Sequence, residues 1–141
     1  MGRYIYELTT GKCVWKYVVA EQPSEQGRLH TEYDLGNYMW GDGGDLLTLS
    51  REEDVPKLHA LAEEFRSTVE AFERETEPCW ETIELPGGTV KGLPSSGPKH
   101  DRYEEVRRRY PDIHFKAMVV AMSDFAKEHP ELEMLRFEGE F

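Results

Sequence analysis

The predicted fold is decided by residues 50–76, SREEDVPKLHALAEEFRSTVEAFERET. Apolar residues recur there at spacings of three and four and form one stripe, while most charged residues fall on other faces. Ser50 and Glu53 have the spacing of a capping box, and Pro56 suits a first helical turn. We therefore predict an amphipathic helix that ends near Thr76 and packs one side on a sheet. The stripe consists of Val55, Leu58, Leu61, Ala62, Phe65, Val69 and Phe72.

A second apolar stripe lies nearer the C-terminus and predicts a second main helix. It consists of Phe115, Met118, Val119, Met122, Phe125 and Ala126, and it ends before Pro130. Residues 101–109 predict a shorter helix, because Pro111 interrupts the pattern that follows. A last strand is expected over residues 132–137.

The remaining segments favour strands and turns. Alternating runs over 4–8 and 13–20 flank a short turn that contains glycine, which is typical of a β-hairpin. The run 29–35 alternates apolar and polar residues and is interpreted as a half-exposed strand. Short strands are also expected over 46–49 and 79–85. A Gly-, Pro- and Ser-rich segment over 86–98 predicts a long surface loop.

These elements predict an α+β fold in a single domain over residues 1–141. The architecture is a two-layer sandwich in which a mainly antiparallel sheet of about five strands carries the two main helices on one face. Short turns join the early strands, so neighbouring strands are expected to be antiparallel.

The charge of the chain limits its partners. It carries 28 acidic residues against 17 Lys and Arg, a net charge of −11. Such a surface repels nucleic acids and anionic membranes, so neither is expected as a partner. It permits a basic protein partner, although acidity also serves solubility alone.

Other compositional signals are weak. The longest apolar run, residues 117–122, is far shorter than the roughly 20 residues of a membrane span. The N-terminus lacks the apolar segment of a secretion signal, so we expect a cytoplasmic protein whose Cys13 and Cys79 are reduced, although counting alone leaves a disulfide possible.

No motif predicts a cofactor, a metal or a catalytic group. Residues 92–99, GLPSSGPK, resemble a phosphate-binding loop only loosely, because Pro98 separates the second glycine from the lysine and removes a backbone N–H. No pair of cysteines or histidines has zinc-site spacing.

Seven residues are candidates for a binding site. Tyr38 and Trp40 stand beside a glycine-rich turn, where aromatic residues serve either a contact surface or the core. Asp42 and Asp45 lie in that turn and could approach one cation, although turn chemistry alone explains them. His30 and Asp34 would share a strand face with Glu32, and His100 lies near Ser95 and Ser96.

Two hypotheses for the function follow. The first is an acidic protein-interaction module, either an inhibitor or immunity-like protein for a basic target or a self-associating subunit. The second is a small-ligand-binding protein or enzyme whose pocket lies between the turns of residues 36–45 and the loop of residues 86–100, with His30, Asp34 or His100 as acid or base.

Overall fold

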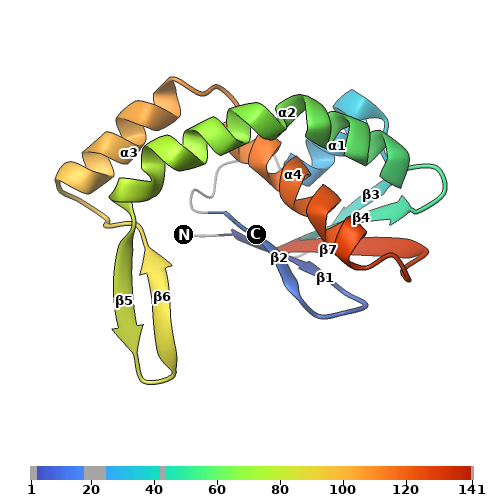
Figure 1. Cartoon of the computed structure of the whole chain (residues 1–141). Coiled ribbons are helices and arrows are strands. Elements are labelled where there is room, and N and C mark those ends of the chain that lie inside the picture. Colours follow the sequence, from blue (N-terminus) through green and yellow to red (C-terminus); the bar gives the residue numbers. More distant parts are fainter. Residues whose placement is uncertain (1–2, 18–24, 42–43, 141) are drawn as a thin grey trace. The chain divides into compact units, whose positions relative to one another are not determined.

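The structure is a computed structural model, and it describes residues 3–17, 25–41 and 44–140. The chain divides into two compact units, the first comprising Met1–Phe65 and His114–Phe141 and the second Arg66–Ile113 (Figure 1). Helix α2 (Val55–Thr76) belongs to both, so the prediction of a single domain stays a prediction.

The first unit contains a five-stranded sheet in the order β2-β1-β7-β4-β3, and all its neighbouring strands are antiparallel. The C-terminal strand therefore lies in the middle of the sheet, and β2 and β3 form its edges. The strands are β1 (Arg3–Glu7), β2 (Cys13–Tyr17), β3 (Asn37–Gly41), β4 (Gly44–Ser50) and β7 (Met134–Glu140).

Helices α1 (Glu25–Tyr33) and α4 (Ile113–Glu128) and the first part of α2 lie on one face of this sheet (Figure 1). The predicted α+β sandwich is thereby confirmed. The apolar stripe of α4 and the part of the α2 stripe that belongs to this unit, from Val55 to Phe65, are buried apart from a half-buried Leu61. They pack over inward-facing strand residues. Those strand residues are Ile5, Leu47, Leu49, Leu135 and Phe137.

The predicted strand over 29–35 is wrong, because these residues form most of α1 and its C-terminal end. Gln26 and Leu29 are buried three residues apart, which is a helical spacing, and Arg28 pairs with Glu32 one turn later at 3.3 Å. The period-two pattern reflected alternating residue types rather than alternating burial, since residues 31–33 are all exposed.

In the turns at both ends of the sheet, carboxylate side chains accept hydrogen bonds from backbone N–H groups. Glu7 is fully buried and accepts hydrogen bonds from the backbone N–H groups of Thr10 (2.8 Å) and Arg136 (3.2 Å). Burial alone would raise the pKa of Glu7, but these N–H groups outweigh it and hold the pKa below its ordinary value. Asp54 accepts from the N–H groups of Gly36 and Ser50 at 3.1 and 2.8 Å, joining the end of α1 to the turn before α2.

The second unit contains the end of α2, a short 3-10 helix (Glu77–Cys79), the hairpin of β5 (Glu81–Leu85) and β6 (Gly88–Gly92), and α3 (Pro98–Arg108). Its core is aromatic: Phe72 makes edge contacts with Tyr103 and Tyr110, with ring centroids 5.7 and 5.5 Å apart. Trp80 contacts Tyr103 in the same way. Burial raises the pKa of Tyr103 to about 12.

The prediction of a loop over residues 86–98 is wrong in part, because the segment contains a strand. Residues 88–92 form β6, which pairs with β5 in a two-stranded sheet separate from the main one. The expected fifth strand therefore exists over 81–85, but its partner is β6.

Two further findings concern the described residues. None of their helices combines the length and the apolar character that a membrane crossing requires. Cys13 is exposed and Cys79 is buried, and both are thiols.

Candidate functional site

A hollow lies at one end of the main sheet, on the three strands β3, β4 and β7. Its volume is about 360 Å³, close to the lower limit of roughly 300 Å³ for small-molecule pockets. It is lined by Met39, Trp40, Gly41, Gly44, Asp45, Leu46 and Glu138.

The hollow lies beside two neighbouring strand positions, on β3 and β4, that carry glycine. Strand register places Met39 beside Leu46, and Leu46 beside Glu138, so these side chains share the face opposite the helices. The next row on that face contains Gly41 beside Gly44. A Cβ atom added to Gly41 would have no atom within 4 Å, so there is open space at this position.

Two large side chains at this place are unusually exposed. Met39 is 70% exposed and Trp40 is 75% exposed, and both stand on β3, an edge strand of the sheet. Successive residues of a strand point to opposite faces, so Met39 and Trp40 flank the edge from its two sides. Most of the exposed large apolar residues of a protein are scattered singly, whereas these two are adjacent.

Buried polar groups hold the edge strand in place. Asp45 is only 3% exposed, and its Oδ2 accepts a hydrogen bond from the hydroxyl of Tyr38 at 2.8 Å. The amide nitrogen of the buried Gln26 donates to Asp45 Oδ1 at 3.0 Å and to the carbonyl oxygen of Phe137 at 3.1 Å. Asp45 and Tyr38 therefore support the site through α1, β3 and β7, and their polar groups are occupied by the protein itself.

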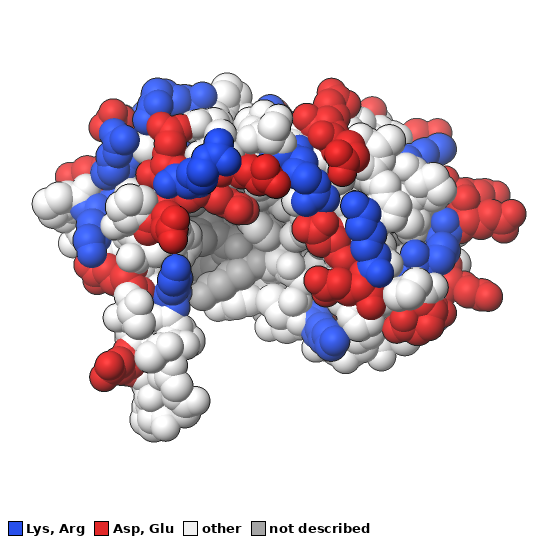
Figure 2. Space-filling model, viewed as in Figure 1, with Lys and Arg blue, Asp and Glu red and all other residues white. Residues whose placement is uncertain are grey.

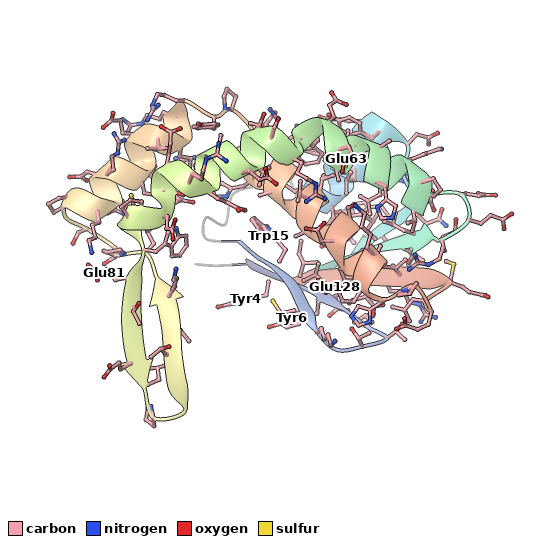
Figure 3. The ribbon with its side chains drawn as sticks, in the orientation of Figure 1. Tyr4, Tyr6, Trp15, Glu63, Glu81 and Glu128 are labelled. Atoms are coloured by element: carbon pink, nitrogen blue, oxygen red, sulfur yellow. The ribbon has the colours of Figure 1, made fainter. Side chains whose placement is uncertain are left out.

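The open face beside the hollow is aromatic and acidic. Tyr6 lies next to Glu138 in the strand register, on the other side from Leu46. Tyr4 and Tyr6 stack with ring centroids 6.2 Å apart, and Figure 3 shows both on the side of β1 away from the helices. Glu138 is exposed. A Lys or Arg side chain could bind at such a place, because its charge would pair with the carboxylate and its methylene groups would contact the aromatic and apolar side chains.

His30 and Asp34 do not belong to this site as predicted. They occupy the C-terminal end of α1, where Asp34 has a φ of 54° and its N–H bonds to the carbonyl of His30. The ring nitrogen Nδ1 of His30 lies 3.0 Å from the carbonyl oxygen of Gly36, and its ring stacks on Tyr38. Their geometry is that of a helix end, so the shared strand face with Glu32 is wrong.

The remaining candidates fall elsewhere. His100 lies in the first turn of α3, where its Nδ1 is 3.0 Å from the carbonyl oxygen of Pro94. Asp42 lies outside the described residues. The pocket predicted between residues 36–45 and 86–100 would combine the two units, and it stays a prediction.

A second polar cluster contains the residue types of a nucleophile and a base. The Nδ1 of His59 on α2 lies 2.6 Å from the hydroxyl of Ser123 on α4. Ser123 is fully buried, however, and a nucleophile needs space for a substrate at its oxygen. Burial, together with Lys127 and Arg51, lowers the pKa of His59, which suits a neutral ring joining two helices.

The sequence reasoning found Trp40, Tyr38 and Asp45 but missed Met39, Leu46, Glu138 and Gln26. Glu138 reaches the site only because the C-terminal strand lies beside β4. Among the described residues, no three His, Cys, Asp or Glu side chains gather as a metal site. Comparisons with protein-family models, curated proteins and solved structures found no match to this chain.

Proposed function

We propose that this chain is a protein-interaction module that binds a basic segment of a partner protein on the open sheet face around Met39, Leu46 and Glu138. The observation that carries the proposal is the adjacent pair Met39 and Trp40, which are 70% and 75% exposed at the edge of the hollow. Trp and Met are enriched in interfaces, and Trp is a frequent hot-spot residue.

The charge of the site supports a basic partner. Glu138 stands on the open face, and the whole chain has a net charge of −11. A Lys or Arg side chain seated in the hollow would place its stem on Leu46 and Met39 and its charge near Glu138. The long-range field of the protein would accelerate the approach of such a partner.

The edge position of β3 supports an extended partner segment. An edge strand offers N–H and C=O groups to an added strand, and alternate side chains of that strand enter neighbouring pockets. A peptide that places a basic side chain in the hollow can therefore gain main-chain hydrogen bonds along β3.

A small cationic ligand is the second candidate, and the hollow volume of about 360 Å³ favours it. Pockets for small ligands usually bury most of the ligand surface. The exposed flanks of this hollow suit a macromolecular partner better.

The probe for a direct test is a short blocked peptide of alternating arginine and valine, titrated into the labelled protein and followed by amide and indole NMR signals. We expect shifts at residues 37–41, 44–46 and 138. The indole signal of Trp40, identified by its loss in Trp40→Phe, should shift as well. A peptide with glutamate in place of arginine should cause none of these shifts.

Two variants locate the contact. Gly41→Leu places a side chain in the hollow at a position where an added Cβ atom has nothing within 4 Å, so we expect it to abolish binding while the protein stays folded. Glu138→Gln should weaken binding by about five- to tenfold, and Glu133→Gln, which changes the net charge equally, should not. Unchanged affinity in Gly41→Leu would exclude this surface as the binding site.

A further inference from the structure

The hairpin of β5 and β6 is the most exposed element of the second unit. Every residue from 81 to 91 is exposed, including Ile83 at 46%, Leu85 at 51% and Val90 at 48%. The hairpin extends away from the helices of its own unit in Figure 1, and Figure 2 shows it as mostly uncharged. An ion pair between Lys99 of α3 and Glu81, 3.4 Å long, links its base to the unit.

The hairpin has one face that is apolar except for Glu81 at its base, and one polar face. Cross-strand partners share a face, so Ile83 and Val90 stand side by side, with Leu85 on the same face. The other face pairs Thr82 with Lys91 and Glu84 with Thr89. An isolated two-stranded hairpin is marginally stable in water, so further strands added at its edge would stabilise it.

We propose that β6 pairs antiparallel with β6 of a second copy of this chain, about a two-fold axis at Val90. Alternate residues of β6 present their N–H and C=O groups at its open edge, and a partner strand satisfies them. The pairing produces a four-stranded sheet with Ile83, Val90, Val90 of the second copy and Ile83 of the second copy in one apolar row.

The charge pattern selects β6 over β5 as the paired edge. Strand β6 carries one charge, Lys91, and no acid, and the two-fold axis places Lys91 opposite Thr89 of the second copy. Glu84 lies beside Thr89 in the hairpin, so each lysine approaches an acid of the other copy. Pairing through β5 would instead bring Glu81 opposite Leu85 and place four acidic residues on the two central strands.

The ends of β6 also suit this contact. Gly88 and Gly92 end the strand and present no side chains to the partner. A two-fold contact uses each β6 edge once and closes as a dimer, whereas pairing of β5 with β6 of another copy would continue into a filament. The edge has five residues, so the contact belongs to the small, weak class of interfaces.

Sedimentation velocity over a wide concentration range tests the proposal. We expect a monomer at about 1 μM and a growing dimer fraction at several hundred μM, as the affinity of a small interface requires. Val90→Glu and Val90→Lys should each remain monomeric, because like charges would meet at the axis. An equimolar mixture of the two should dimerise, because the axis brings glutamate against lysine.

The control is Thr82→Glu, which adds a charge to the polar face of β5 and should dimerise like the unaltered protein. Recovery in the mixture shows that loss in the single variants is not caused by a melted hairpin. A monomer at every concentration, or a dimer that both Val90 variants leave intact, would overturn the proposal. Neither result depends on the arginine peptide, whose binding at Glu138 is measured below the dimerisation range.

Discussion

Gly36, just after α1, shows how a single residue can be fixed by its surroundings. Its φ is +59°, and a Cβ atom there would lie 2.2 Å from the backbone oxygen of Thr48. Its N–H also donates to Asp54. We expect Gly36→Ala to lower the free energy of unfolding by at least about 3 kcal/mol, because the clash is with backbone on the adjoining strand.

Gly11 is a matched control for that prediction. Its φ of +71° is similar, but an added Cβ would have nothing within 4 Å. Gly11→Ala should therefore lower the free energy of unfolding only by the cost of a positive φ for alanine, about 1 kcal/mol. Urea unfolding of both variants separates the two contributions, and equal losses would show that the contact with Thr48 is unimportant.

His59 predicts a pH dependence of stability. Its pKa is lowered by burial, and next by Lys127 and Arg51, so the folded state prefers the neutral ring. The unfolded chain, with an ordinary histidine pKa near 6.5, then binds more protons in mildly acidic solution. Stability from this group is complete above about pH 6.5 and is lost as the pH falls from there toward the folded pKa.

The test compares unfolding free energies of the unaltered protein and of His59→Gln between about pH 5 and 7.5. The difference between the two should shrink toward the acidic end, because glutamine does not titrate. Parallel pH curves would contradict the assignment to His59.

Ser123→Ala should lower the free energy of unfolding by about 1–3 kcal/mol at neutral pH, since it leaves a ring nitrogen of His59 without its partner.

At the scale of elements, long stripes were predictable and short segments were not. The stripe from Val55 to Phe72 repeats over several turns, so its period is unambiguous. Residues 25–33 make only about two and a half turns. The alternation of Thr31 and Tyr33 with charged neighbours imitated a strand. Strand β6 has glycine at both ends, which local composition assigns to a loop; only its pairing with β5 makes it a strand.

Arg51 joins two elements that the sequence does not connect. Its guanidinium donates to the carbonyl oxygens of Ala126 (3.1 Å) and His129 (2.8 Å) at the end of α4, and to that of Leu132. A cation at a helix C-terminus also complements the helix dipole. Arg51→Met keeps an unbranched apolar stem but removes the guanidinium, and it should lower the free energy of unfolding by about 2 kcal/mol.

Arg51→Met should destabilise the C-terminal end of α4 in particular, in addition to lowering the stability of the whole protein. Hydrogen exchange of the His129 amide, which donates to Phe125, should accelerate in Arg51→Met more than exchange in the middle of α4. Uniform acceleration along the helix would show that Arg51 contributes general stability and does not specifically hold this helix end.

At the scale of the whole molecule, the candidate site combines parts that sequence reasoning could and could not supply. Trp40 and Asp45 belong to one aromatic and glycine-rich segment, which composition makes visible. Glu138 is distant in sequence and reaches them through the pairing of β7 with β4. Strand order is set by which edges find partners, and no local pattern in residues 134–140 records it.

The net charge of −11 predicts opposite salt dependences for the two proposed contacts. Added salt shortens the Debye length, to about 8 Å at 0.15 M, and screens both attraction and repulsion. Binding of the arginine peptide near Glu138 should weaken as NaCl rises, because it is attractive between opposite charges. Pairing of two β6 strands should strengthen, because two acidic chains repel each other outside the contact. Titrations at low and high salt, by NMR for the peptide and by sedimentation for the dimer, measure both signs in one buffer series. A dimer that dissociates as salt rises would contradict this prediction, because it would mean that the approach of each Lys91 to Glu84 of the other copy outweighs the repulsion between the two acidic chains.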